Sequence, residues 1–171
     1  RTLITGSHPE YWTTSMMDSL ETWLSGGGRM MYLGGNGFFW RTAYHTTRPG
    51  VVEVRRSGME QLWAHAAGET VFSTQPEPGG TWAHAGRPPN LVAGVGFVTQ
   101  GFDANSYYRK REDAADPRAA FVFEYVPEEI IGDFGALMGG AAGYEIDRHD
   151  ESLGSPAHAL VLASSENHSN L

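Results

Sequence analysis

The first part of the chain carries a strand–helix–strand pattern, and this pattern constrains the fold more than any other feature. Residues 2–6 form a short apolar run typical of a buried strand, and apolar side chains recur at helical spacing between 14 and 24. Glycines at 26–28 end that helix, and residues 29–34 form a second buried apolar run. Because such a crossover is right-handed, the two strands are expected to lie parallel. We therefore predict an α/β fold with a parallel-sheet core.

The rest of the chain predicts additional β structure and one long loop. Further strands are expected at 38–45, 51–56, 121–126, 143–148 and 159–163. The first two of these are expected to form a hairpin around residues 48–50. Residues 68–89 are rich in Pro, Gly and Thr, which predicts an ordered loop held by Phe72 and Trp82.

Three shorter segments allow more specific predictions. Ser15 and Asp18 have the spacing of a capping box for the first helix. Residues 90–98 fit either a short helix or a strand. The basic and aromatic run at 107–111 is interpreted as a solvated turn or a subunit contact.

Size and composition exclude several classes of partner. The 171 residues suit a single α/β domain spanning 1–171, and a formal net charge of -8 gives no basic surface for nucleic acid. The longest apolar runs fall far short of the ~20 residues that cross a bilayer, so no membrane contact is expected. The chain has no cysteine, so any metal must use oxygen or nitrogen ligands. The cytoplasm is the default compartment.

The N-terminus indicates that the chain is a piece of something longer. There is no initiator Met, and the sequence opens directly on a strand without a preceding turn. We interpret the chain as a fragment or processed product, truncated at its N-terminus.

The loop after the first strand, residues 6–12, concentrates groups that can do chemistry. His8 and Glu10 are two residues apart, so in an extended backbone both side chains point the same way, and Pro9 stiffens the spacing. The pair suits a carboxylate metal ligand oriented by an imidazole, or an acid and base pair. An equally weighted alternative is that Glu10 caps the following helix and His8 bonds a backbone carbonyl.

A second loop follows the second strand and carries Asn36 among glycines. Loops at the carboxyl ends of neighbouring parallel strands share one crevice, so Asn36 is expected opposite His8. Its amide could donate to a substrate carbonyl oxygen as charge builds there. The structural alternative is that Asn36 only occupies a left-handed backbone position.

Glu145, Asp147 and Arg148 form a charged cluster after small residues. These side chains either take part in a site or form a structural salt-bridge network. The glycines before them match no phosphate-binding fingerprint.

Four sequence blocks together resemble the C-terminal part of the large subunit of the N,N-dimethylformamidase family. They occur in the same order, at residues 5–12, 28–41, 94–102 and 143–148. The resemblance implies a mononuclear ferric iron amidohydrolase in a domain similar to class I glutamine amidotransferase folds. In that family two tyrosinates and one carboxylate hold the metal, and hard oxygen ligands suit such an ion.

The resemblance also implies roles for residues of this chain. Glu10 would be the carboxylate ligand, and His8, Asn36 and Glu145 would surround the substrate and water. The two tyrosine ligands lie upstream of the His-Pro-Glu block, and Tyr11 does not replace them. The chain alone is therefore expected to hold iron weakly or not at all, to lack the first strands of its sheet, and to expose apolar surface.

The function implied is hydrolysis of a small amide, N,N-dimethylformamide, to dimethylamine and formate. The expected partners are the upstream part of the large subunit, a small subunit and further copies in an oligomer. Two alternatives stay open at this point. The chain could be a non-catalytic α/β binding or assembly module, or it could act on a different small amide.

Overall fold

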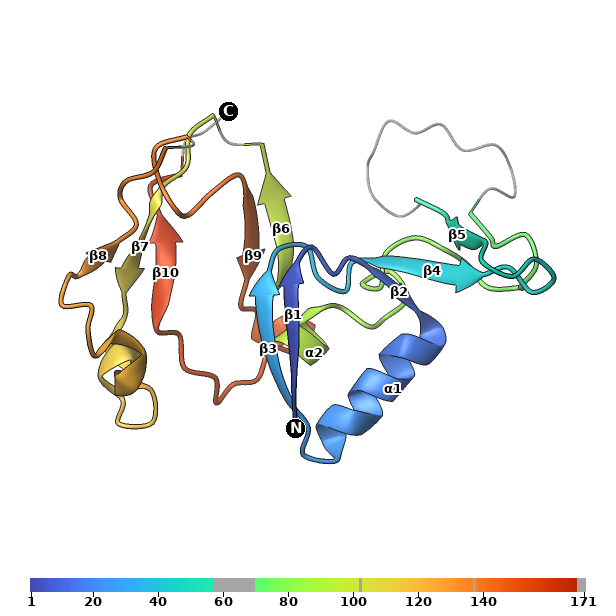
Figure 1. The fold of residues 1–171 in the computed structure, drawn as a ribbon, viewed down its shortest axis with the longest axis horizontal. Coiled ribbons are helices and arrows are strands. Elements are labelled where there is room, and N and C mark those ends of the chain that lie inside the picture. Colours follow the sequence, from blue (N-terminus) through green and yellow to red (C-terminus); the bar gives the residue numbers. More distant parts are fainter. Residues whose placement is uncertain (57–69, 102, 137, 169–171) are drawn as a thin grey trace. The chain divides into compact units, whose positions relative to one another are not determined.

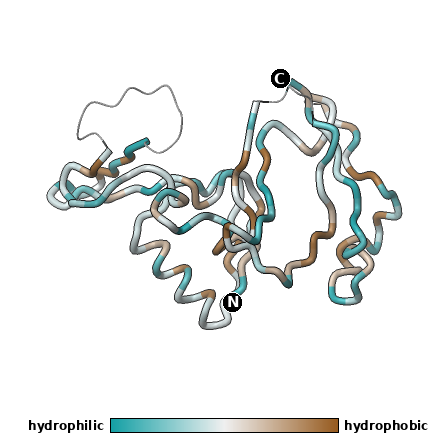
Figure 2. Tube along the Cα trace, turned by 180° about the vertical axis from the view of Figure 1, so that it is seen from behind, coloured by the Kyte–Doolittle hydropathy of each residue, from teal (hydrophilic) through white to brown (hydrophobic). Residues whose placement is uncertain are grey.

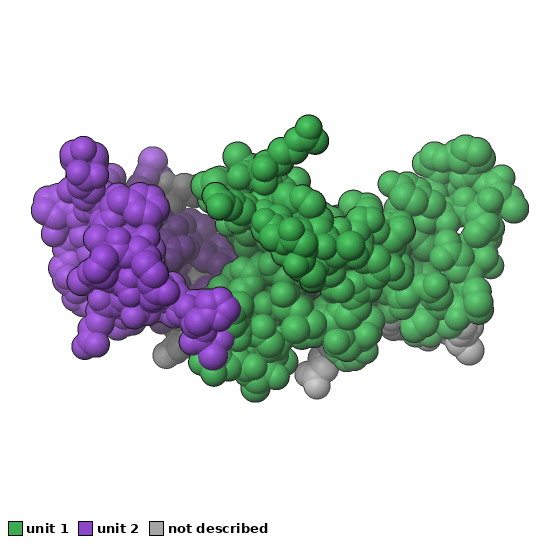
Figure 3. All heavy atoms as spheres, turned by 90° about the horizontal axis from the view of Figure 1, so that it is seen from below, with its two compact units in different colours: residues 1–97, 147–156 green, residues 98–146, 157–171 purple. Residues whose placement is uncertain are grey.

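The computed structural model describes residues 1–56, 70–101, 103–136 and 138–168 (Figure 1). The chain divides into two compact units, coloured separately in Figure 3. The first comprises Arg1–Phe97 with Asp147–Pro156, and the second Val98–Ile146 with Ala157–Leu171. The units are described one at a time. The prediction of a single domain over 1–171 stays a prediction.

The first unit holds most of the regular structure. Its elements are β1 (Thr2–Ser7), β2 (Tyr11–Thr13), α1 (Thr14–Ser25), β3 (Arg29–Gly34), β4 (Trp40–Tyr44), β5 (Val52–Val54), α2 (Asn90–Ala93) and the 3-10 helix η3 (Glu151–Leu153). The division between the units falls inside β6 (Gly96–Gln100) and β9 (Glu145–Arg148), which pair with each other.

The predicted strand–helix–strand unit is confirmed. β1 and β3 pair in parallel, from Thr2 opposite Arg29 to Ser7 opposite Gly34, and α1 is the crossover between them (Figure 1). The capping box predicted at Ser15 is wrong, because the helix begins earlier. Thr13 has an extended backbone and its side chain accepts the Met16 N–H at 3.3 Å, so Thr13 is the N-cap.

The core of the first unit lies on the side of β3 that faces α1. It consists of four buried side chains: Met17, Leu20, Phe38 and Trp82. Burying each such side chain contributes about 1.5–3 kcal/mol. Met30 and Tyr32, two residues apart on β3, pack against this cluster, as the period of a strand requires.

The opposite face of the β1–β3 pair is open to solvent. Ile4 is 62% exposed, and its neighbours on β3, Met31 and Leu33, are 49% and 58% exposed. Figure 2 colours the trace of the chain by the hydropathy of each residue. The prediction that both strands are buried is wrong for this face, because no described layer covers it. The prediction of exposed apolar surface is confirmed.

The predicted hairpin is also confirmed, as part of a three-stranded sheet. β4 pairs antiparallel with β5 on one side and parallel with β2 on the other. Of the loop predicted at 68–89, residues 68 and 69 lie outside the described residues. In the remainder Phe72 and Trp82 are buried as predicted, and the guanidinium groups of Arg41 and Arg87 lie 5.4 and 5.0 Å from the Trp82 ring.

Residues 90–98 contain both of the structures that were expected as alternatives, because the short helix α2 is followed by the strand β6. Gly94 ends α2 in a left-handed conformation with φ at 77°. The predicted strand at 143–148 is confirmed as β9.

The second unit differs more from expectation. Its elements are β7 (Tyr107–Lys110), the 3-10 helices η1 (Glu112–Ala115) and η2 (Ala120–Phe123), β8 (Ile130–Ile131) and β10 (Ala163–Glu166). The run at 107–111 is not a turn, because β7 pairs antiparallel with both β10 and β8. These partners lie far away in the sequence, so local composition gave no sign of them.

The strand predicted at 121–126 is wrong. The Asp116 carbonyl accepts the N–H groups of Ala119 and Ala120 at 2.9 and 2.8 Å, and 3-10 turns continue from there. Local turns thus satisfy the backbone, and the apolar side chains of Phe121 and Tyr125 are largely exposed.

The last strand begins later than predicted at 159–163. Before it, the Val161 N–H donates to the Asp113 carboxylate at 2.8 Å, and the Leu162 carbonyl accepts the Arg111 N–H at 2.9 Å. The ladder of β10 therefore starts at Ala163, opposite Lys110.

The fold class is mixed α/β, as predicted. The described strands form four small sheets of two or three strands each, and a parallel-sheet core of the glutamine amidotransferase type is not confirmed. Among the described residues, no helix has the length and apolar character needed to span a bilayer.

Candidate functional site

The loops that follow β1 and β3 lie side by side, as predicted for parallel neighbours. The Gly35 N–H donates to the Ser7 carbonyl at 3.2 Å, and the Phe38 N–H donates to the Pro9 carbonyl at 2.8 Å. The Glu10 carbonyl accepts two further N–H groups, from residues 39 and 40, at 3.0 and 2.8 Å. Four backbone hydrogen bonds therefore join the segment from Ser7 to Glu10 to the segment from Gly35 to Trp40.

This close approach depends on glycine at the end of β3. A Cβ atom on Gly34 would lie 1.7 Å from the Ser7 carbonyl oxygen, so no side chain fits there. Ser7 itself adopts a left-handed conformation with φ at 56°, which turns the chain out of β1. Glycine at position 34 is thus a requirement of the contact between the two loops.

His8 and Glu10 lie close together, but the backbone between them is a tight turn and not extended as predicted, because the Glu10 N–H donates to the His8 carbonyl at 2.9 Å. His8 Nδ1 lies 3.4 Å from Glu10 Oε1, and the side chains are 48% and 21% exposed. The alternative in which Glu10 caps α1 is wrong, since Thr13 fills that position. The carboxylate of Glu10 is therefore available for a role at the loop edge.

Asn36 occupies the left-handed backbone position that its structural interpretation predicts. This does not conflict with the second interpretation, in which its amide binds a substrate. Its backbone is left-handed with φ at 52°, as one alternative predicted. The residue is only 9% exposed, and its Oδ1 atom has no hydrogen-bond partner among the described residues. Leaving a buried polar atom unpaired costs about 1–3 kcal/mol, so an amide in this position is suited to a ligand. A half-turn of the amide presents its NH2 group instead.

Tyr32 joins the site, although the sequence analysis did not select it. Its hydroxyl accepts the Gly37 N–H at 2.7 Å and donates to Asp147 Oδ2 at 2.9 Å. Burial raises the pKa of Tyr32 well above its usual range; the Gly37 N–H opposes this, and the negative charges of Asp147 and Glu10 add to it. The only sequence signal for Tyr32 was its position two residues after Met30 on the core side of β3.

The charged cluster around β9 separates into different roles. Arg148 pairs with Asp150, with 2.6 Å between Nη2 and Oδ2, and Asp147 accepts the hydrogen bond from Tyr32. Glu145 belongs to the second unit. Its role beside His8 and Asn36 stays a prediction.

The described residues offer few ligands for the expected metal ion. Among residues 1–56, 70–101, 103–136 and 138–168, no group of three or more His, Cys, Asp or Glu side chains could hold an ion. Glu10 offers a carboxylate that fits one ligand position of a hard cation. The described part of the chain therefore supplies no complete ligand set made of His, Cys, Asp or Glu side chains.

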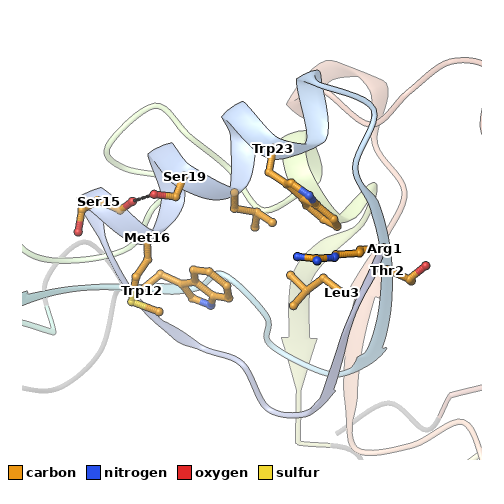
Figure 4. A pocket seen from close by; sticks show the side chains of 9 residues that line it. Arg1, Thr2, Leu3, Trp12, Ser15, Met16, Ser19 and Trp23 are labelled. Carbon is orange, nitrogen blue, oxygen red and sulfur yellow. Dashed lines mark hydrogen bonds between the residues drawn. The ribbon is translucent and has the colours of Figure 1, made fainter.

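An apolar pocket of about 640 Å³ lies between β1 and α1, within the first unit (Figure 4). Leu3 lines it from β1, and Met16 and Trp23 line it from α1. Trp12 also lines it, and its indole N–H donates to the Pro9 carbonyl at 2.6 Å. The wall of this pocket is therefore attached directly to the His8–Glu10 loop.

The parallel strands β1 and β3, joined by α1 and followed by polar loops, are typical of an α/β protein. A family model described as N,N-dimethylformamidase beta subunit-like, C-terminal, matches residues 1–170, and the chain belongs to this family. The resemblance seen in the four sequence blocks is thus confirmed.

Two curated relatives are much longer than the chain that matches them. The N,N-dimethylformamidase beta subunit of Paracoccus aminophilus is 42% identical over 168 residues, which cover 98% of this chain and 22% of the relative. The protein of the same name from Alcaligenes sp is 42% identical over 170 residues, or 99% of this chain and 22% of the relative. The chain therefore spans about a fifth of the length of these curated relatives.

Proposed function

We propose that this chain forms one side of the active site of an amide hydrolase. The substrate class is a small N-substituted amide, N,N-dimethylformamide, which is hydrolysed to dimethylamine and formate. The observation that carries the proposal is the buried Asn36 side chain, whose Oδ1 atom has no partner among the described residues, on a turn that backbone hydrogen bonds hold beside His8 and Glu10. The names of the two relatives support the same chemistry.

Each residue has a defined part in this proposal. The Asn36 NH2 group donates to the carbonyl oxygen of the amide as negative charge develops there. His8, half exposed beside Glu10, takes a proton from water and returns it to the leaving amine. Glu145 is the second candidate for this proton transfer.

Glu10 is proposed as one ligand of a mononuclear ferric ion. Two tyrosinate ligands would come from outside this chain, in the upstream part of the large subunit. When bound, such an ion supplies Lewis-acid polarisation of the carbonyl or a bound water of lowered pKa. Within this chain, the contact with His8 orients the Glu10 carboxylate for that position.

The proposal extends to the fold and partners of the chain. We infer that β1, α1 and β3 are part of a larger parallel sheet similar to that of class I glutamine amidotransferases. The exposed apolar face of Ile4, Met31 and Leu33 supports a covering layer from the upstream part of the large subunit. A small subunit and further copies of the large subunit would complete a cytoplasmic oligomer.

A second candidate function is assembly without catalysis. Large exposed apolar side chains in the second unit, including Phe121 and Tyr125, favour a role in holding subunits together. Hydrolysis of a different small amide is the third candidate, because family membership does not fix the substrate.

One experiment separates these candidates. The full-length gene product is purified and assayed for iron, for a tyrosinate charge-transfer absorption and for formate release from N,N-dimethylformamide. The hydrolase proposal predicts all three in the unmodified protein and their loss in Glu10→Ala. Glu124→Ala, at an exposed residue of the second unit, serves as the matched control and should retain all three. A folded, metal-free and inactive full-length protein contradicts the proposal and favours the assembly function.

A further inference from the structure

Tyr32 contacts the turn that carries Asn36 through both its ring and its hydroxyl. A Cβ atom on Gly37 would lie 2.6 Å from the Tyr32 ring, so the turn rests directly on that ring. The Phe38 ring packs beside it, with 5.8 Å between centroids. Packing against these aromatic rings therefore fixes the position of the turn.

The hydrogen bond to Gly37 fixes the orientation of one particular peptide plane. The Gly37 N–H belongs to the peptide that joins residues 36 and 37, and it donates to the Tyr32 hydroxyl at 2.7 Å. The tilt of this plane sets ψ of Asn36, which already has a left-handed φ of 52°. The direction of the Asn36 side chain thus depends on where the Tyr32 oxygen lies.

Asp147 determines which role the Tyr32 hydroxyl plays. A phenolic hydroxyl can donate one hydrogen bond and can also accept. Because its proton is directed to Asp147 Oδ2 at 2.9 Å, a lone pair is left to accept the Gly37 N–H. Two consecutive hydrogen bonds therefore link Asp147, Tyr32 and Gly37 in a fixed direction, and they end beside Asn36.

From these contacts we propose that Tyr32 is a positioning residue, which holds the Asn36 amide in its working orientation through Gly37, with Asp147 fixing the direction of its hydroxyl. Tyr32 does not touch the substrate in this scheme. The inference rests on the proposed function, because it assigns Asn36 the role of oxyanion donor.

The first test is kinetic and uses the full-length gene product with N,N-dimethylformamide. Tyr32→Phe keeps the ring but removes both hydrogen bonds, and kcat is expected to fall about 10- to 100-fold with little change in KM, as for a misplaced catalytic group. Tyr44→Phe, at an exposed tyrosine of β4, is the matched control and should leave kcat unchanged. Asp147→Asn keeps an acceptor and should lose less than Asp147→Leu.

A double-mutant cycle distinguishes positioning from a general structural role. If Tyr32 acts through Asn36, Tyr32→Phe combined with Asn36→Gly is no slower than Asn36→Gly alone. The inference is overturned if the two substitutions lower kcat by factors that multiply in the double variant. It is also overturned if a lowered melting temperature of Tyr32→Phe accounts for its loss of kcat.

A crystallographic comparison keeps the inference separate from the proposed function. Structures of the unmodified full-length protein and of Tyr32→Phe are compared at residues 36 and 37. A rotated peptide plane and a redirected Asn36 amide support the positioning role even if the unmodified protein hydrolyses no amide, an outcome that would contradict only the proposed function. An unchanged Asn36 amide in Tyr32→Phe overturns the inference whatever the activity.

Discussion

The two faces of the β1–β3 pair have opposite surroundings although both carry apolar side chains. On one face Met30 and Tyr32 pack against the core formed with α1, and the strands lead into the hydrogen-bonded loops of the candidate site. On the other face Ile4, Met31 and Leu33 are about half exposed or more. One side of the sheet is thus packed as a protein interior. The other side carries similar apolar side chains, which no described part of the chain buries fully.

This difference shows what the chain supplies by itself. The core side orders the two loops through contacts within the first unit. The open side has the side chains of an interior, which the proposed covering layer from the large subunit would bury. The predictions below test each side of the sheet and the loops at its edge, beginning with the largest expected effect.

Asn36→Gly should have the largest effect on catalysis. Glycine tolerates the left-handed backbone at this position, so the fold is preserved while the amide is lost. Turnover of N,N-dimethylformamide by the full-length product should fall about 10²- to 10³-fold, as for loss of an oxyanion donor. Turnover equal to that of the unmodified protein would remove Asn36 from the mechanism.

Glu145→Gln should also lower turnover by orders of magnitude, because the amide cannot transfer the proton assigned to this side chain. The variant is assayed in the full-length product, and circular dichroism checks that the fold is kept. Unaltered kinetics would leave His8 as the proton carrier and would confine the site to the first unit.

How far the sequence predicts this molecule depends on whether the decisive contacts are local. Helical periodicity and the glycines predict β1, α1 and β3 correctly. The sequence also placed His8 and Glu10 together, although a tight turn over Pro9 does this and not the extended backbone that was expected. The strand at β7 depends on distant partners, and the apolar run at 121–126 is folded into turns begun by Asp116. Tyr32 was missed because a tyrosine on the core side of a strand is usually only a packing residue.

Gly34→Ala tests the contact between the two loops. The added Cβ would lie 1.7 Å from the Ser7 carbonyl oxygen, so the backbone of one loop must shift. We expect destabilisation of about 3 kcal/mol, at the upper end for overpacking, together with lost activity. Denaturant unfolding measures the loss of stability. Gly27→Ala is the comparison variant, because Gly27 has a left-handed backbone but open space around it, so the added Cβ meets no other atom.

A pair of methionine substitutions tests the two environments of the sheet region. Met17→Ala removes a fully buried side chain of the core and should destabilise by about 2–5 kcal/mol. Met31→Ala should change the stability of the 171-residue chain by less than about 0.5 kcal/mol, because this side chain is exposed there. In the full-length product Met31→Ala should be clearly destabilising, and a neutral result there would argue against a covering layer.

The smallest expected effect concerns the start of α1. Thr13→Ala removes the side chain that accepts the Met16 N–H and should destabilise by about 1 kcal/mol. Ser15→Ala, at the position that the sequence favoured as the cap, should have a smaller effect. Thermal unfolding of the two variants decides the order, and a larger loss for Ser15→Ala would contradict the observed cap.

The central claim is that the His8–Glu10 loop and the Asn36 loop form one site for an amide. A crystal structure of the full-length product with N,N-dimethylformamide or formate bound tests it most directly. The account predicts a ligand oxygen within hydrogen-bond distance of the Asn36 amide, with the Glu10 carboxylate bound to the metal at the same site. A ligand bound elsewhere, with the Asn36 amide paired to protein groups, would contradict the account.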